Sequence, residues 1–445
     1  MHPETKQACL VKVPSSKKAR LCSDQNFEDK FSSLHESIVS RILSHLPTVE
    51  AVSTSVLSKS WRNMWTSITE LQFDDKMHRD PTDSRFTDFV DRVIGNIGSH
   101  HINSFHLSSV NSYDEAFVIS WLSEVLKRNL QRLVITCHEL DSVNFSPLFP
   151  SFGSLVELRL RTKSIIDISA PALLPNLKFL SLEDARIFNL SSVSTNLVLN
   201  FPVLETFEAS YSRCFRTDTV ILDSPLLRIF EMFKCTSVHV PNASQVCKIR
   251  VLASNLEKIT FSGNDSRKIL LSFPPSLPEA YLALSRSHWS KKFLSSFTCV
   301  RSLGLELSKD FHVFTLPKFR QLVYLHLIYD MTRYFILAQF LEAAPILEML
   351  SIRDLTSPRS SPTEKFLKEL RSEESPDCIR TMLKVLQIRN FKPNRLQTSV
   401  LRCVMENAGI LGSVILSSPN PITEEAKAQI LSYPKASPHA PVFFE

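Results

Sequence analysis

The sequence predicts an elongated α/β molecule, in which stacked repeats build a parallel sheet and a small helical segment precedes them. Three observations lead to this prediction. A six-residue apolar phrase, Leu-x-x-Leu-x-Leu or a close variant, recurs along most of the chain. Residues 31–73 have a different apolar spacing, one typical of short helices. At 445 residues with 43% hydrophobic content, the chain is too long for one ordinary core but can bury a continuous one along an array.

The recurring phrase has the period of a leucine-rich repeat solenoid. Most successive copies are 21 to 29 residues apart. Alternate residues of a strand share a face, so Leu158 and Leu160 are expected to point into the core while Glu157 and Arg159 point to the open face. A further copy near Leu277 is degraded. The clear copies begin at Ile102, Leu130, Leu155, Leu177, Leu204, Leu227, Leu256, Val300, Leu322, Leu347, Leu383 and Leu411.

The segments between the copies are predicted to be of mixed structure. Residues 334–344 have a helical pattern, whereas other connectors are rich in Ser, Pro and Asn and are not expected to be helical. The long step from Leu347 to Leu383 contains Ser357–Pro362, which predicts a loop, with a phosphorylated switch as the alternative. A proline is expected to end the connector two residues before the first leucine in four copies, at Pro175, Pro202, Pro225 and Pro345.

Composition and charge argue against several classes of function. The net charge is +6, from 51 basic and 45 acidic residues that are scattered along the chain, which gives no support for nucleic-acid binding. No apolar run is long enough for a membrane helix. The nine cysteines include no Cys-x-x-Cys pair, which predicts reduced thiols in the cytoplasm or nucleus and no metal site. The seven glycines form no phosphate-binding loop, and we find no catalytic set; the chain is predicted to need no cofactor and not to be an enzyme.

The outward positions of the predicted strands form the candidate binding face. Their mixed charge and few aromatic side chains suit a protein or peptide partner. A merely solvated face is the alternative. The candidate residues are Arg132, Glu157, Arg159, Phe179, Glu183, Glu208, Glu231, Lys258, Tyr324, His326 and Arg353.

Residues 31–73 are predicted to form three short helices. The first ends at Pro47, the second spans Thr48 to Leu57, and the third spans Lys59 to Trp65 after an N-cap at Ser58. Trp61 and Trp65 are four residues apart and should share a helix face. So small a bundle cannot bury all of its apolar surface, and part of that surface should meet a partner or the solenoid.

The same segment resembles an F-box. Residues 31–48 look like the opening of this domain, and residues 51–65, with Val-Leu-Ser-Lys-x-Trp-Arg-x-x-Trp, are similar to its second half in plant proteins. Two departures stand out: the usual Leu-Pro is Leu34-His35, and the usual Arg before the first Trp is Ser60. Proline suits the first turn of a helix, so its loss is expected to loosen the helix start.

The far end resembles the FBD domain that closes many plant F-box proteins. The similarity covers residues 378–416 and predicts a strand, a helix and a strand that cap the solenoid. The predicted organisation is a tail at 1–26, an F-box at 28–75, irregular leucine-rich repeats at 100–375, an FBD-like cap at 376–432, and a tail at 433–445 that adds little. Lys17-Lys18-Ala19-Arg20 in the first tail could serve nuclear import, against the plainer reading of a solvated tail.

The resemblance implies a substrate receptor of a Skp–cullin–F-box ubiquitin ligase. Such a chain would hold an unknown protein target on its repeat face and bind a Skp-type adaptor, and through it cullin. Two alternatives remain: an interaction scaffold that has lost its ligase, and a small-molecule sensor on the same fold. The resemblance implies adaptor contacts at Leu34, Ile38, Ile42, Leu46, Pro47, Val52, Leu57, Trp61 and Trp65.

Overall fold

A computed structural model describes most of the chain. Ser58, the N-terminal tail with its basic patch, and the Ser357–Pro362 loop lie outside the described residues. Those described are 34–57, 59–76, 85–111, 113–137, 143–167, 174–188, 196–215, 219–238, 246–263, 268–284, 289–308, 311, 315–355 and 376–445.

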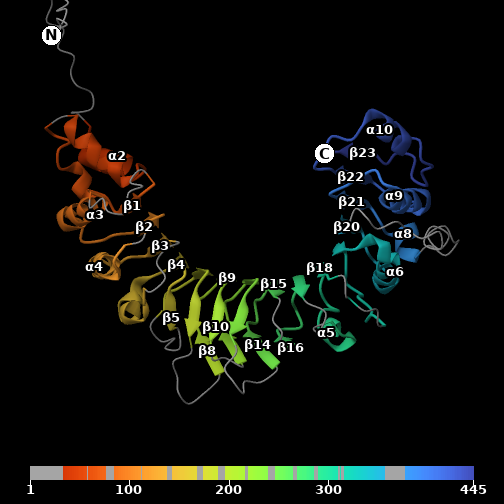
Figure 1. Cartoon of the computed structure of the whole chain (residues 1–445), viewed down its shortest axis with the longest axis horizontal. Coiled ribbons are helices and arrows are strands. Elements are labelled where there is room, and N and C mark those ends of the chain that lie inside the picture. Colours follow the sequence, from red (N-terminus) through yellow and green to blue (C-terminus); the bar gives the residue numbers. More distant parts are fainter. Residues whose placement is uncertain are drawn as a thin grey trace, which may run out of the picture.

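Within this part of the chain, fifteen strands form one parallel sheet, in which each strand between the two ends pairs with the strands of the repeats before and after it. The sheet lines the inner side of an arc, and the helices lie on its outer side (Figure 1). In order across the sheet, the strands are β1 (Glu70–Asp74), β2 (Ser104–Ser109), β3 (Arg132–Cys137), β4 (Glu157–Thr162), β6 (Phe179–Glu183), β9 (Thr206–Ser210), β12 (Ile229–Phe233), β15 (Lys258–Gly263), β17 (Glu279–Leu284), β18 (Ser302–Leu307), β19 (Tyr324–Tyr329), β20 (Met349–Asp354), β21 (Val385–Arg389), β22 (Ser413–Ser417) and β23 (Val442–Phe444).

The leucine phrases lead into these strands as predicted. Leu155 comes two residues before β4 and is fully buried, and Leu158 and Leu160 of the strand are each 1% exposed. Leu158 is in register with Leu133 of β3 and Leu180 of β6, so the leucines stack from one repeat to the next. The degraded copy near Leu277 also forms a strand, β17. The predicted solenoid is therefore confirmed.

The non-helical connectors form two further parallel sheets, which the sequence did not predict. Leu197 and Leu199 alternate inward in these connectors, as a half-buried strand requires. Both sheets lie on the outer side of the arc, opposite the main sheet (Figure 1). One consists of β5 (Ile165–Asp167), β7 (Arg186–Phe188), β10 (Arg213–Phe215) and β13 (Thr236–Val238), and the other of β8 (Asn196–Asn200), β11 (Thr219–Asp223), β14 (Val246–Leu252) and β16 (Lys268–Ser272).

Helices cover the outer side toward both ends of the arc (Figure 1). The helical connector predicted at 334–344 is confirmed as α6 (Tyr334–Ala343). The other helical segments that follow β1 in the described residues are α3 (Arg85–Asn96), α4 (Glu115–Leu126), the 3-10 segments η3 (Ser146–Ser154) and η6 (Met331–Arg333), α5 (Lys291–Ser295), α8 (Asp377–Thr381), α9 (Arg395–Asn407) and α10 (Glu424–Leu431).

Where the structure describes the N-terminal segment, it contains two α-helices rather than three. These are α1 (Glu36–Leu43) and α2 (Thr48–Ser53), followed by 3-10 turns η1 (Thr54–Val56) and η2 (Met64–Ser67). The predicted third helix is wrong. The Met64 N–H donates to the Trp61 carbonyl at 3.2 Å, a tight i→i+3 bond, and Trp61 is buried where Trp65 is only partly so. Tight turns of this kind let Trp61 enter the core separately from Trp65.

The helical segment runs directly into the main sheet. Its last residues form β1, which pairs with β2. The backbone N–H of Gln72 in β1 donates to the Thr48 hydroxyl of α2 at 2.7 Å, and the Gly98 N–H donates to the Thr66 carbonyl at 2.9 Å. These bonds tie α2 to β1, and η2 to the residues that follow α3.

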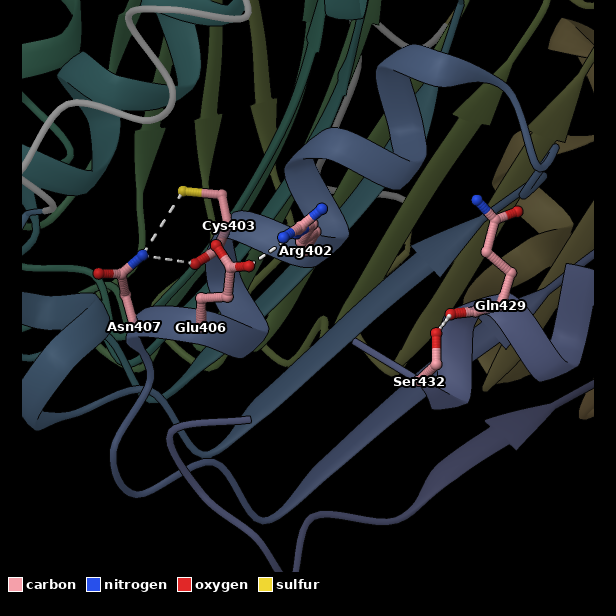
Figure 2. A network of polar contacts seen from close by, with 6 residues as sticks. All are labelled: Arg402, Cys403, Glu406, Asn407, Gln429 and Ser432. Atoms are coloured by element: carbon pink, nitrogen blue, oxygen red, sulfur yellow. Dashed lines mark hydrogen bonds and ion pairs between the residues drawn. The ribbon is translucent and has the colours of Figure 1, made fainter. Parts of the chain in front are cut away.

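The C-terminal end has the strand, helix and strand expected there, as β21, α9 and β22. Figure 2 shows polar contacts of α9 and α10: Arg402 pairs with Glu406 at 2.6 Å, and the Asn407 amide donates to the Cys403 carbonyl at 2.8 Å. Residues 433–445 were expected to add little, and this is wrong. They supply β23, which pairs with β22 and is the last strand of the sheet. Without β23, the backbone N–H and C=O groups along one side of β22 would lack a strand to pair with.

Candidate functional site

The helical segment exposes an unusual amount of apolar surface. Among the predicted adaptor contacts, Ile38 and Ile42 of α1 are 49% and 42% exposed, and Leu57 is 67% exposed. Two apolar neighbours that are not among the predicted adaptor contacts, Val49 and Val56, are also exposed. We refer to these five residues as the F-box apolar set. Apolar surface of this kind on so small a segment is typical of a protein-binding site.

The remaining predicted contacts divide differently. Pro47 is exposed. Trp61 is only 5% exposed and belongs to the hydrophobic core. Four others are partly buried and pack against that core: Leu34, Leu46, Val52 and Trp65. The structure thus separates residues that face solvent from residues that hold the segment together, while the adaptor contact of all nine stays a prediction.

A side chain caps the N-terminus of α1, where the resemblance led us to expect a loosened helix start. His35 occupies the N-cap position, and its Nδ1 accepts a hydrogen bond from the Ser37 N–H at 3.3 Å. The Ser37 hydroxyl lies 2.8 Å from the same nitrogen. One of the unpaired N–H groups at the helix start is therefore satisfied.

The eleven candidate target-binding residues all lie on the inner face of the main sheet, in three rows that run across the strands. Ladder register places Arg132, Glu157, Phe179, Lys258 and Tyr324 in the first row, Arg159, Glu208, Glu231 and His326 in the second, and Glu183 and Arg353 in the third. We refer to this set as the inner face.

Much of the charge on the inner face is paired, either within one strand or between strands of the main sheet. Lys258 binds Glu231 at 2.9 Å, and this hydrogen bond is the main cause that raises the pKa of the lysine. The Arg159 guanidinium pairs with Glu157 and lies 4.0 Å from the centre of the Phe179 ring. Such partly exposed pairs add little stability but hold the side chains in defined places.

His326 is held in a basic neighbourhood near the C-terminal end of the inner face. It is 9% exposed, and its Nδ1 lies 2.9 Å from the Ser351 hydroxyl. Burial, followed by the charges of Arg389 and Arg353, lowers the pKa of His326 to about 4. The ring is therefore neutral at physiological pH and serves as a hydrogen-bonding group.

Sequence reasoning missed several residues of the inner face. Arg161 and Arg389 occupy the third outward position of β4 and β21, which the period of two already indicated. Tyr281 lies in the degraded copy, and its hydroxyl donates to Glu306 at 3.3 Å. Its ring lies across Gly304 of β18 so closely that a Cβ there would collide with it. Glycine is thus the residue that lets the aromatic ring cross the strand.

A polar hollow of about 660 Å³ lies where the helical segment meets the inner face. Its walls come from α1 and from the first three strands of the main sheet, with Arg41, His45, His106 and Arg132 among the lining residues. No signal in the sequence indicated this hollow, because its two walls come from segments that are distant in the chain, α1 on one side and β1 to β3 on the other.

Three buried thiols are not suited to chemistry. Burial raises the pKa of Cys137 to about 12 and that of Cys235 and Cys378 to about 11, so these thiols are poor nucleophiles and metal ligands. In the described ranges, no three potential ligands are grouped as a metal ion would need. A search of the same ranges found no helix with the length and apolar character to cross a membrane.

The parallel arc and the exposed helical segment at its end define a leucine-rich repeat protein that carries an F-box. Known families match both parts. The model described as At1g61320/AtMIF1, LRR domain, matches residues 94–434, and the F-box domain model matches residues 31–72.

Two curated plant proteins give the finer relationship. The F-box/FBD/LRR-repeat protein At3g14710 of Arabidopsis thaliana is 79% identical over 445 residues, which is 100% of both chains. The F-box/FBD/LRR-repeat protein At3g52680 of the same plant is 28% identical over 411 residues, covering 89% of this chain and 87% of the relative. The chain belongs to the plant F-box/FBD/LRR-repeat family.

Proposed function

We propose that this chain is the substrate-recognition subunit of a Skp–cullin–F-box ubiquitin ligase, acting in the cytoplasm or nucleus. The F-box apolar set docks on a Skp-type adaptor and through it on cullin, and the inner face holds a protein target. The chain itself makes and breaks no bond, because it only raises the local concentration of the target near the conjugating enzyme.

One observation supports this proposal most: the F-box apolar set stays exposed on a segment that is hydrogen-bonded to the first repeats. Apolar surface supplies the free energy of docking, at a contact of about 800 Å² per partner. The bonds of Gln72 to Thr48 and of Gly98 to Thr66 keep the docked end in a fixed relation to the inner face. A target held there would therefore be presented at a defined position in the ligase.

The test is co-purification of the full chain with a Skp-type adaptor. The double variant Ile38→Asp, Ile42→Asp should weaken adaptor binding by about 100-fold, since it places charge in an apolar contact. Val198→Asp is the matched control, because Val198 is 45% exposed but lies on the outer sheet. Circular dichroism checks that both variants fold.

Trp61→Ala is not a suitable interface variant. Truncating a buried Trp costs about 3–5 kcal/mol of stability, so a loss of binding would not identify a contact. If the wild-type chain fails to bind the adaptor at micromolar concentration, the ligase proposal fails and the scaffold alternative takes its place.

A further inference from the structure

Two arginines lie side by side near the C-terminal end of the inner face. Arg353 of β20 and Arg389 of β21 are in register with each other, and both side chains are exposed. Among the described residues, neither guanidinium forms an ion pair. Like charges directly opposite each other on neighbouring strands repel, so an anion bound between them would relieve an unfavourable contact.

The carboxylates of the same row do not reach these arginines. The row runs from Glu306 of β18 through Ile328 of β19 and the two arginines to Ser417 of β22. Glu306 accepts a hydrogen bond from the Tyr281 hydroxyl at 3.3 Å, and Glu445 accepts one from the Ser417 hydroxyl at 2.9 Å. Each carboxylate is separated from the nearer arginine by one strand, so the row supplies no direct counter-ion.

A chain of hydrogen bonds holds the neighbouring polar groups in place. The Ser351 hydroxyl donates to Oε1 of Gln387 at 3.1 Å, and Nε of Arg389 donates to the same oxygen at 3.2 Å. Because that hydroxyl has only one proton, its oxygen accepts the 2.9 Å bond from Nδ1 of His326. We refer to Arg353, Gln387 and Arg389 as the arginine site. With the Gln387 oxygen already used, this site offers N–H donors and no free acceptor, which suits an anion.

Apolar side chains lie on two sides of the arginine site. Along the strands, the first row carries Met349 and Val385, which are in register with each other. Across the strands, Ile415 of β22 is in register with Gln387, and Phe443 of β23 with Ile415. Met349 and Phe443 are 38% and 50% exposed. A peptide that continues past the site in both directions would cover these side chains, which favours an internal residue of a partner over its chain terminus.

We propose that the arginine site binds the carboxylate of an aspartate or glutamate side chain, within an extended and otherwise apolar segment of the target protein. The proposal rests on the proposed function, because it names the kind of target segment that the inner face holds. The planar forks of two guanidinium groups match the two oxygens of a carboxylate. The apolar surroundings favour this singly charged group over a phosphoryl group, because nearly two charges would otherwise have to leave water.

The experiment measures binding of the full chain to oriented peptide libraries with randomised flanks and amidated C-termini. The fixed central residue is glutamate, aspartate, glutamine, lysine or phosphoserine. We expect the glutamate and aspartate pools to bind about tenfold or more tightly than the glutamine pool, with a loss as salt is raised. Apolar residues should be enriched on both sides of the selected acid.

Each part of the proposal has its own contrary outcome. Equal binding of the glutamate and glutamine pools overturns the site. Tighter binding of phosphoserine than of glutamate overturns the assignment to a carboxylate. A glutamine pool with a free C-terminal carboxylate that binds as tightly as the amidated glutamate pool overturns the assignment to a side chain. Selected flanks without apolar enrichment contradict the apolar segment.

Charge reversal supplies the matched variants. Arg353→Glu should remove the preference for glutamate over glutamine, and the double variant Arg353→Glu, Arg389→Glu should select the lysine pool instead. Arg250→Glu is the control and should keep the wild-type preference, because Arg250 is an exposed arginine of β14 in the outer sheet. An equal loss in Arg250→Glu and Arg353→Glu would show an effect of net charge and refute the site. Thermal unfolding checks that the variants fold.

Adaptor capture by the same proteins separates this proposal from the previous one. The F-box apolar set precedes β1, whereas β20 and β21 lie toward the far end of the main sheet (Figure 1). Arg353→Glu should therefore bind the adaptor as the wild type does. A wild-type chain that selects acidic peptides without binding the adaptor would refute the ligase proposal and keep the site. Adaptor binding without acidic selection would refute the site alone.

Discussion

His35 illustrates how one side chain replaces the usual residue of a motif. Its φ of −64° equals the value that a proline ring imposes, and its N–H donates no hydrogen bond within the described part of the chain. The imidazole supplies a cap that proline would not. The structure therefore corrects the expectation that the departure loosens the helix start.

The effect of this cap can be measured by replacement. His35→Ala should lower the free energy of unfolding by about 0.5–1 kcal/mol, because the Ser37 N–H loses its acceptor. His35→Pro should be close to neutral, because it fits the backbone and stiffens the unfolded chain. Urea unfolding gives both values. If His35→Pro lowers the free energy of unfolding more than His35→Ala does, the His35 cap does not take the place of the usual proline.

His326 should make the stability depend on pH. The folded chain protonates this ring only near pH 4, whereas an unfolded histidine binds a proton below about 6.5. The contribution of His326 to the free energy of unfolding is therefore fully present above about pH 6.5. It is lost as the pH falls toward 4, because the unfolded state binds more protons than the folded state over that range. His326→Gln should flatten the stability profile between pH 7 and 4. If the stability of the variant still changes with pH as steeply as that of the wild type, other titrating groups cause the dependence.

At the scale of elements, the connection between the F-box and the repeats depends on a buried carboxylate. Asp75, just after β1, is fully buried. It accepts hydrogen bonds from the Ser109 hydroxyl at 2.6 Å, the Val110 N–H at 2.8 Å and the Tyr113 hydroxyl at 2.9 Å, as well as from Asn111. Burial and Asp75 together raise the pKa of Tyr113. The network fixes the end of β1 against the loop that leads to α4.

Breaking the network should destabilise this junction. Asp75→Ala should cost about 2–3 kcal/mol, because several buried donors lose their acceptor. Asp75→Asn keeps one acceptor oxygen and should cost less. Urea unfolding measures the loss, and limited proteolysis shows whether cleavage begins near residue 75. Equal costs for the two variants would mean that only packing matters here.

At the scale of the whole molecule, the two ends of the sheet decide how much unpaired strand edge the arc exposes to other chains. The last residues of the F-box enter β1, the first strand, and at the other end β23 pairs with β22. The outward side chain of β23, Phe443, is 50% exposed. An array whose terminal strand is lost would expose a ready template for pairing with another chain.

Deletion of residues 433–445 should therefore have two effects. The midpoint of thermal unfolding should fall, by about 2–4 °C for each kcal/mol lost, and the chain should self-associate as its concentration rises. Calorimetry and light scattering measure these effects. Phe443→Ser keeps the strand and is the control. A truncated chain as stable and monomeric as the control would show that β23 is dispensable.

The sequence by itself determined the repeats, the inward and outward positions of the strands that follow the clear leucine phrases, and the identity of the F-box. These depend on local periodicity, as at Leu155, Leu158 and Leu160, where a spacing of two residues sets the face and the repeat length sets the register. Only the tertiary structure decided that Trp61 is buried, that residues 442–444 join the sheet, and that Arg41 lines a hollow together with Arg132. Each of these depends on segments that are distant in the chain, and burial, pairing and cavities arise only when such segments pack together.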